Sequence, residues 1–232
     1  NDLNEGYTFG DLLNDVAKTN IPRIRFMTSH PWNFDDKMIE AIKNNKNIMP
    51  YIHLPIQSGN TEILRKMNRR YTREEYLNLY DKLKTELPNF AFTTDIIVGF
   101  PNESDEAFED TLSAVEHCEY DNAFTFIYSK REGTPAANFE DPIDRKTKEE
   151  RLQRLNERVA YYANKNNQKY KDKIVEVLVD GASKRNSEVY SGYTPENKLV
   201  NFKGNNVKVG DIVKVKITEV MSFSLNGQLV ED

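Results

Sequence analysis

The most constraining feature of this sequence is a regular alternation of strand-like and helix-like segments between residues 8 and 128. Short apolar and β-branched runs predict strands at 23–27, 51–54, 92–98 and 123–128. Apolar residues at helical spacing predict helices at 11–19, 35–44, 72–87 and 104–117. A strand followed by a helix, repeated along the chain, predicts a parallel sheet with right-handed crossovers.

The pattern changes after a long charged helix. A capping box, Thr147-Lys-Glu-Glu150, predicts the start of this helix, and its end is expected near Gln168. Beyond it, turn signals such as Asn226-Gly227 separate short segments of β character. Strands are expected at 174–179, 188–193, 199–202, 212–220 and 224–230. Several short strands in a small segment predict a closed barrel, so we expect two domains, residues 1–168 and 169–232.

Composition narrows the class of protein. Cys118 is the one cysteine, which rules out an internal disulfide, makes the reducing cytoplasm the expected location, and leaves an iron–sulfur cluster without its several thiolates. We therefore expect no metal site in this chain. No apolar run approaches the roughly 20 residues of a membrane span, so no membrane association is expected.

Charge is unevenly distributed along the chain. The net charge is −5, but residues 165–232 carry 11 Lys and Arg against 9 Asp and Glu, a net of +2. This segment is therefore the better candidate for contact with nucleic-acid phosphates.

The segments that follow the predicted strands resemble one another in composition. They are rich in Gly, Ser, Thr and Pro: Thr28-Ser-His-Pro31, Pro55-Ile-Gln-Ser-Gly59, Gly99-Phe-Pro-Asn-Glu103 and Ser129-Lys-Arg-Glu-Gly-Thr-Pro135. In a parallel α/β barrel, the carboxyl ends of the strands hold the site. Such loops bring backbone donors close to a polar ligand, which predicts a binding edge.

Each of these segments also has a purely structural interpretation. Gly99-Phe-Pro101 is compatible with a tight strand exit, and Gln57-Ser58 with a helix cap. His30 fits a partnered structural histidine, and Arg131 a surface ion pair. The sequence has no nucleophile elbow, no phosphate-binding Gly-Lys-Ser/Thr loop and no His-Glu-x-x-His motif. An enzyme of this kind is expected to leave the difficult chemistry to a cofactor.

Several long strings, in order along the chain, resemble the MiaB-type radical SAM tRNA methylthiotransferases. They are Arg23-Ile-Arg-Phe-Met-Thr-Ser-His-Pro31, His53-Leu-Pro-Ile-Gln-Ser-Gly59, Thr93-Thr-Asp-Ile-Ile-Val-Gly-Phe-Pro-Asn-Glu103, Phe124-Thr-Phe-Ile-Tyr-Ser-Lys-Arg-Glu-Gly-Thr-Pro-Ala-Ala137 and Lys148-Glu-Glu-Arg-Leu-Gln-Arg-Leu155. The tail resembles a TRAM domain at Ser191-Gly-Tyr-Thr194 and Leu199-Val-Asn-Phe-Lys-Gly204. The resemblance implies an α/β fold: a partial parallel (β/α) radical SAM barrel, holding its last four strands, and then a five-stranded all-β TRAM barrel.

The resemblance also implies a function. The family installs a methylthio group on N6-isopentenyladenosine next to the tRNA anticodon, with S-adenosylmethionine (SAM) and two 4Fe–4S clusters as cofactors. The expected partners are the tRNA anticodon stem-loop and an N-terminal domain of the same polypeptide. The family's cluster cysteines are missing here, so we expect this chain, as a C-terminal part, to be catalytically inactive alone.

Individual residues acquire expected roles from the resemblance. Gln57 and Ser58 would lie near the SAM ribose, and Gly99, Phe100 and Pro101 would line the adenine side. The residues expected to face the cofactor or substrate cavity are Thr28, Ser29, His30 and Arg131.

Two alternatives remain open. Enzymes acting on N6-threonylcarbamoyladenosine share the Gln-Ser-Gly and Gly-Phe-Pro strings, whereas Thr28-Ser-His-Pro31 favours the isopentenyladenosine type. The other alternative is a non-catalytic RNA-binding module. Its tail would contact phosphates through Lys184, Arg185, Lys198 and Lys203. Bases would stack on Tyr190, Tyr193, Phe202 and Phe223, although we expect about half of these aromatics to pack inside the barrel.

Overall fold

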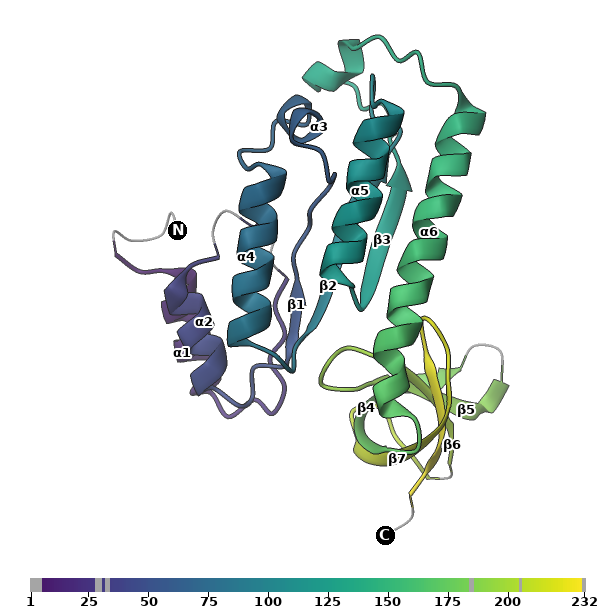
Figure 1. The fold of residues 1–232 in the computed structure, drawn as a ribbon. Coiled ribbons are helices and arrows are strands. Elements are labelled where there is room, and N and C mark those ends of the chain that lie inside the picture. The colour runs from purple at the N-terminus through teal and green to yellow at the C-terminus, as the bar shows by residue number, and fades with distance from the viewer. Residues whose placement is uncertain (1–5, 28–30, 32–33, 184–185, 205, 231–232) are drawn as a thin grey trace. The chain divides into compact units, whose positions relative to one another are not determined.

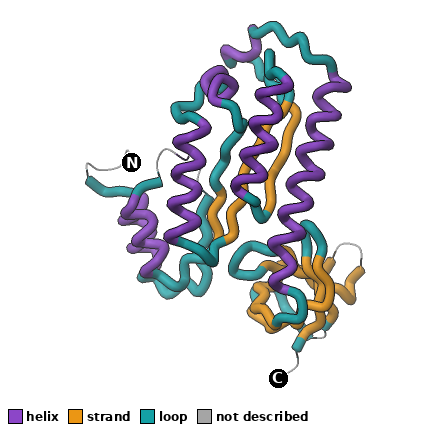
Figure 2. The backbone as a smooth tube through the Cα atoms, in the orientation of Figure 1, coloured by secondary structure: helices purple, strands orange, loops and turns teal. Residues whose placement is uncertain are grey.

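The computed structural model describes residues 6–27, 31, 34–183, 186–204 and 206–230. The chain divides into two compact units. One, the α/β unit, comprises residues 1–118 and 123–158, and the other, the barrel unit, comprises residues 119–122 and 159–232. Figure 2 shows the corresponding change from mixed helices and strands to strands that dominate the C-terminal part.

The α/β unit is built on a three-stranded sheet. Its strands are β1 (Tyr51–His53), β2 (Ala91–Val98) and β3 (Asn122–Ile127), in the order β1-β2-β3. β1 and β2 run parallel, with His53 opposite Thr93. The helices are α1 (Phe9–Ala17), α2 (Asp36–Asn44), α3 (Thr61–Lys66), α4 (Arg73–Glu86), α5 (Asp105–Cys118) and the first part of α6 (Arg145–Asn167), with a short 3-10 turn, η2, at Pro135–Asn138. From Val159 onward, α6 belongs to the barrel unit. Figure 1 shows α4 and α5 along one side of the sheet, as a parallel α/β fold requires.

The first expected strand, residues 23–27, is wrong as a strand. Only Ile24 forms a parallel bridge, to Ile48, and its N–H donates to the carbonyl of Asn47 at 2.7 Å. Both neighbours of Ile24 are arginines, so Ile24 is the one apolar side chain buried at this point. The guanidinium of Arg25 lies over the Tyr51 ring. The described sheet therefore has three strands where the sequence predicted four.

Helix starts follow local capping chemistry. Thr72 caps α4 with the predicted reciprocal box to Glu75, which is confirmed. The predicted box at Thr147 is wrong as the start of α6, because α6 begins two residues earlier at Arg145. The carboxylate of Asp144 accepts the Thr147 N–H at 2.9 Å and also its hydroxyl, so Asp144 takes the capping position.

The barrel unit confirms the predicted closed, five-stranded barrel. Its strands are β4 (Ile174–Ser183), β5 (Asn186–Tyr193), β6 (Leu199–Lys203), β7 (Ile212–Val220) and β8 (Leu225–Leu229), in the order β4-β5-β6-β8-β7. Its core is apolar: Val177, Val179, Val200, Phe202, Val215, Ile217 and Leu225, with Tyr170 from the turn η3 (Gln168–Tyr170). A side chain at Gly227 would begin 2.5 Å from the carbonyl oxygen of Lys216, so only glycine allows β7 and β8 to approach there.

None of the helices in the described parts of the chain combines the length and apolar character needed to cross a membrane.

Candidate functional site at the carboxyl edge of the sheet

The loop after β1 crosses the sheet edge in a left-handed conformation. Gln57 has φ 67°, its N–H donates to the Asp95 carbonyl, and its own carbonyl accepts from the Ile97 N–H, at 2.8 and 2.9 Å. Ser58 is fully buried, and its hydroxyl accepts from the Asn60 N–H at 3.3 Å. Ser58 therefore holds the loop in shape. Gln57 is also buried, at 8% exposure, and its side-chain amide forms no hydrogen bond with another described residue.

Gly99, which follows β2, also has a left-handed conformation, with φ +67°. The side chain of Lys148 lies where a Cβ would project from this glycine. Phe100 is 3% exposed and its ring packs 4.9 Å from that of Tyr128, between centroids. Gly99 and Phe100 thus form the wall of this edge, and Pro101 is buried beside them.

One apolar cluster joins the three described strand exits. It is formed by Ile63, Phe100 and Ala107, with Met67, Tyr128 and Ala136 packed against it. The carboxyl ends of the described strands therefore meet at one edge, as the recurring loop composition predicted.

A buried carboxylate that the sequence analysis did not single out fixes the β2 exit. Glu103 accepts from the Gly99 N–H at 2.8 Å and pairs with Arg151 at 2.9 Å, and both side chains are less than 10% exposed. Burial raises the pKa of the Glu103 carboxyl, while the Gly99 N–H and Arg151 oppose that rise. Because the partners are 48 residues apart in sequence, no local sequence pattern predicts the pair.

A second group that the sequence analysis missed lies on β1 and β2. The hydroxyl of Thr93 lies 2.9 Å from Nδ1 of His53 and 2.8 Å from the Tyr51 hydroxyl. Nε2 of His53 lies 3.3 Å from a carboxylate oxygen of Asp95, and the Phe124 ring packs edge-on against the imidazole. We call Tyr51, His53, Thr93 and Asp95 the polar sheet cluster. A histidine paired with a carboxylate can orient a polar ligand or hold a proton.

The alternation of Thr93 and Asp95 along β2 was the available signal for this cluster. The recurring composition of the loops marks only the strand ends, so it gives no sign of polar side chains within the strands.

The remaining predicted residues of this edge differ in their placement. Arg131 is exposed, and its carbonyl accepts from the Thr134 hydroxyl. Thr28, Ser29 and His30 lie outside the described residues.

The described residues do not fit an iron–sulfur cluster. Cys118 is a single buried thiol at the end of α5, and the described residues contain no group of three or more His, Cys, Asp or Glu placed to hold a metal ion. The same edge does fit a polar nucleoside such as SAM, because Gln57 lies in the β1 exit loop and Phe100 supplies an apolar wall. The polar sheet cluster lies further back, within β1 and β2.

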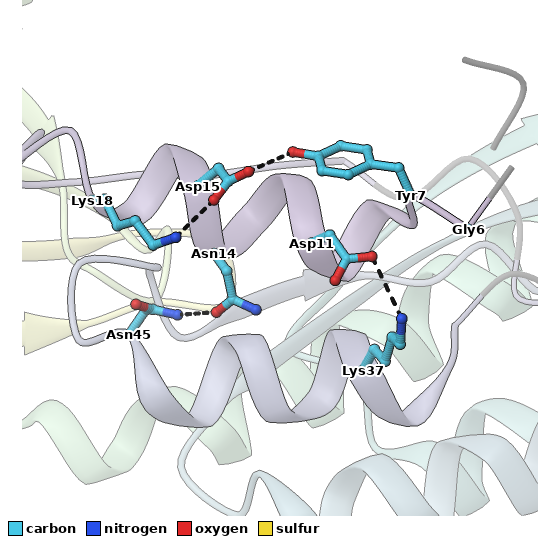
Figure 3. Close-up of a pocket in the computed structure, with 8 residues that line it drawn as sticks. All are labelled: Gly6, Tyr7, Asp11, Asn14, Asp15, Lys18, Lys37 and Asn45. Atoms are coloured by element: carbon cyan, nitrogen blue, oxygen red, sulfur yellow. Dashed lines mark hydrogen bonds and ion pairs between the residues drawn. The ribbon is translucent and has the colours of Figure 1, made fainter. Parts of the chain in front are cut away.

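A shallow pocket between α1 and α2 is lined by groups that satisfy one another (Figure 3). Asp15 pairs with Lys18 at 2.8 Å and accepts from the Tyr7 hydroxyl at 2.8 Å. Asp11 lies 3.5 Å from Lys37. The Asp11–Lys37 pair joins α1 to α2, whereas the contacts of Asp15 stay within residues 7–18. Few groups are left for a ligand.

Basic residues on the barrel fall into two kinds. Lys203 on β6 lies opposite Gln228 on β8, and Gln228 lies opposite Lys216 on β7. All three side chains are exposed. They form an outward row suited to phosphate contact. Lys184 and Arg185 lie outside the described residues.

Lys198 contradicts its expected role as a surface phosphate contact. Its side chain is 8% exposed, and its ammonium pairs with Asp121 at 2.7 Å. Burial lowers the pKa of Lys198, and Asp121 opposes that shift. The segment 119–122 belongs to the barrel unit, so this pair holds the segment to the barrel.

The barrel aromatics divide as expected between core and surface. Phe202 is 1% exposed and stacks on Tyr190, whereas Phe223 is 52% exposed. Tyr190 is partly buried against the core, and Tyr193 is half-buried.

Two family models match the chain. Residues 5–115 match the radical SAM superfamily, and residues 168–230 match the TRAM domain. A solved structure of coproporphyrinogen III oxidase from Escherichia coli, a radical SAM enzyme, matches 75% of this chain and 46% of that chain with a TM-score of 0.50. At 14% identity, this similarity concerns the fold alone.

Curated relatives are far more similar. The chain is 57% identical over 226 residues to a tRNA-2-methylthio-N(6)-dimethylallyladenosine synthase from Bacillus cytotoxicus, covering 97% of this chain and 44% of that protein. Proteins of the same name from Shouchella clausii and Staphylococcus epidermidis are 53% and 51% identical, with 99% and 97% of this chain covered. The chain spans 44% of the length of each of these relatives.

The two matched domains, in this order, and identity above one half along nearly the whole chain lead to one conclusion: the chain belongs to the MiaB-type radical SAM tRNA methylthiotransferase family.

Proposed function

We propose that this chain is part of an enzyme that adds a methylthio group to N6-isopentenyladenosine next to the tRNA anticodon. The observation that carries the proposal is the 51–57% identity, over 97–99% of the chain, to synthases named for that nucleoside. We assign residues 1–168 to the radical SAM barrel, residues 169–232 to a TRAM domain that binds RNA, and the enzyme to the cytoplasm.

The carboxyl edge of the sheet is the proposed cofactor side. The loop of Gln57 and Ser58 would lie along the SAM ribose, with the Gln57 amide as the contacting group. The adenine ring would lie against Gly99, Phe100 and Pro101. Glu103 would hold these residues in place, because its carboxylate accepts from the Gly99 N–H. When bound, SAM supplies the radical and the methyl group of the family's reaction.

The substrate side is the proposed place of Thr28, Ser29, His30 and Arg131. The polar sheet cluster would orient the bound nucleoside or cofactor through the His53 imidazole and the Asp95 carboxylate, which lie 3.3 Å apart.

The tRNA anticodon stem-loop is the proposed macromolecular partner. The outward row of Lys203 and Lys216 suits phosphate contact, and Lys184 and Arg185 remain proposed contacts. Lys198 is removed from this set because its charge is buried against Asp121. With one cysteine in this chain, the thiolates of the two 4Fe–4S clusters would come from elsewhere in the polypeptide, its N-terminal domain included.

Nucleoside mass spectrometry tests the proposed function. Digested tRNA from cells with and without the gene would be compared, and a third strain would carry the gene restored. We expect the methylthio group on isopentenyladenosine to disappear without the gene and to return with it.

Loss of the methylthio group from threonylcarbamoyladenosine would instead place the protein with the sister enzymes. No change in either nucleoside would refute the enzyme and favour a non-catalytic RNA-binding module.

A further inference from the structure

A strongly basic stretch follows β1 and has no place in the function proposed above. Between Arg65 and Arg73 the chain carries five cations, and no Asp or Glu, in a protein whose net charge is −5. The cations are Arg65, Lys66, Arg69, Arg70 and Arg73.

Internal partners account for two of the five. Arg65 pairs with Glu62 at 3.1 Å, one turn away on α3. Arg73 donates to the Gly59 carbonyl at 2.9 Å and to the Ser113 hydroxyl at 2.6 Å. These two arginines therefore have structural roles.

The other three cations have no such partners, and we call Lys66, Arg69 and Arg70 the basic rim. Lys66 and Arg70 are exposed and form no ion pair with any described residue. Arg69 is half-buried, and its buried Nε has no hydrogen-bond partner in the described structure. A buried guanidinium N–H without an acceptor is costly unless a ligand or water supplies one.

The backbone holds the basic rim in one arrangement. Asn68 takes a left-handed conformation, with φ 59°, and its N–H donates to the Arg65 carbonyl at 2.9 Å. The Arg69 N–H returns to the Leu64 carbonyl at 2.8 Å. This turn ends α3 and fixes the position of Arg69 and Arg70 beyond it.

The basic rim lies at the edge of the sheet where the site is. Ile63, two residues before the basic stretch, and Met67 within it pack in the cluster that joins the exits of β2 and β3. Figure 1 shows α3 at the end of the sheet toward which the β3 arrow points. After β3, the exposed Lys130 and Arg131 follow Tyr128, which packs in that same cluster.

Helix capping explains only part of the basic stretch. Cations in the last turn of a helix are favourable, which covers Arg65 and Lys66. It does not explain two further arginines beyond the end of a six-residue helix, or the unpartnered Nε of Arg69.

We propose that the basic rim binds the sugar–phosphate backbone of the RNA substrate at the carboxyl edge of the sheet. This inference rests on the proposed function. Guanidinium groups match phosphate oxygens in a two-pronged geometry, and cations this close together on a fixed backbone suit a polyanion with closely spaced charges. The basic rim would position the RNA over the edge where the reacting nucleoside must lie, as a contact separate from that of the barrel.

Salt-dependent RNA binding tests the basic rim. A fluorescent anticodon stem-loop RNA would be titrated with the full chain, and anisotropy recorded at a series of salt concentrations. The variant Lys66→Gln/Arg70→Gln removes two charges from the basic rim. The control, Lys18→Gln/Lys46→Gln, removes two exposed charges from segments before β1, where the Asn47 amide donates to the Ala17 carbonyl. Lys18 forms an exposed pair with Asp15, a surface contact that contributes little to stability.

We expect the basic-rim variant to bind about 10-fold more weakly at low salt. The slope of log affinity against log salt should become shallower by roughly one to two, because each phosphate contact contributes nearly one. The control should stay within about twofold of wild type. The variant Lys66→Arg/Arg70→Lys keeps both charges and should restore the slope, and circular dichroism checks that each variant folds.

A basic-rim variant with the affinity and slope of wild type would overturn the inference, as would absence of RNA binding by the wild type. Polyglutamate would be titrated in the same way. If the wild type binds polyglutamate and the basic-rim variant loses that binding while its RNA binding stays intact, the inference is also overturned, in favour of an acidic protein partner. The nucleoside measurement distinguishes this failure from failure of the proposed function, because it reads the modification and not the affinity of this surface.

Discussion

Two buried ion pairs hold the irregular segments of this protein. Glu103 and Arg151 meet at 2.9 Å behind the β2 exit, and Lys198 and Asp121 meet at 2.7 Å in the barrel unit. Each pair loses hydration on burial, and the attraction between the partners offsets that cost only while both are present. Removal of one partner is therefore the informative change.

Lys198→Ala should lower the free energy of unfolding by about 3 kcal/mol, because it leaves the Asp121 carboxylate buried without its cation. The double variant Asp121→Leu/Lys198→Met should recover most of that loss. Urea denaturation of the full chain, followed by circular dichroism, measures both.

The matched control for this cycle is Lys203→Ala, which removes an exposed lysine from the neighbouring strand and should cost little. Equal effects of Lys198→Ala and Lys203→Ala would contradict a stabilising role for the buried pair.

At the scale of the element, the long charged helix shows how a cap decides where a helix begins. Asp and Thr are both favoured at the N-cap, so Asp144 competes with the predicted Thr147 for the same turn. The Thr147 N–H and hydroxyl both donate to the Asp144 carboxylate, so α6 starts after Asp144.

This geometry predicts a pH-dependent stability effect. Bonds from Thr147 hold the pKa of the Asp144 carboxyl below its ordinary 3.8. A carboxyl with a lowered pKa in the folded state stabilises the fold at pH values above its ordinary pKa. This stabilisation is lost as the pH falls through the lowered pKa. Asp144→Ala should therefore lower the Tm at pH 7, and the carboxylate's part of the difference should disappear below pH 3.8.

Thermal melts of the full chain across this pH range provide the measurement. Asp144→Asn keeps a capping oxygen and should retain much of the Tm at pH 7, whereas Thr147→Ala should have the smaller effect of the two alanine variants. A larger loss of Tm from Thr147→Ala than from Asp144→Ala would show that Thr147 is the capping residue.

At the scale of the whole molecule, each unit has a separate apolar core. The five described strands of the barrel unit close on one another and leave no free edge among them. The α/β unit gathers its strand exits on one cluster and carries the basic rim at that same edge. The binding features proposed here therefore belong to two surfaces, one on each unit.

The cysteine content gives a prediction for the whole chain. After anaerobic incubation with iron and sulfide, the desalted chain should hold no 4Fe–4S cluster, because Cys118 is its one thiol and is buried. It should also release no 5′-deoxyadenosine from SAM under reducing conditions. Metal analysis and liquid chromatography measure these outcomes.

Cys118→Ala is the control for adventitious iron and should behave as wild type does. A bound cluster, or SAM cleavage that depends on the chain, would show that cluster thiolates from elsewhere are not needed.

The local sequence pattern was sufficient to predict much of the architecture. Periods of 3.6 and 2 residues identified α1, α2, α4, α5 and the five strands of the barrel, because these periods follow from which face of each element is buried. The short helix α3 was not predicted. The cap at Thr72 and the meeting of the strand exits at one edge were predictable for the same reason, since turn and cap chemistry is local. The short strand-like run at 23–27 failed because a strand also needs partners along its length.

Only the tertiary structure decided the environment of individual charged groups. Lys198 became a buried partner of Asp121, 77 residues away, and His53 met Thr93 and Asp95 about 40 residues away. The composition of the chain by itself determined that it has one thiol and a weakly basic tail. Burial and pairing depend on which distant segments pack together, and so the fold alone separates a lysine that holds a loop from one that is free to contact phosphate.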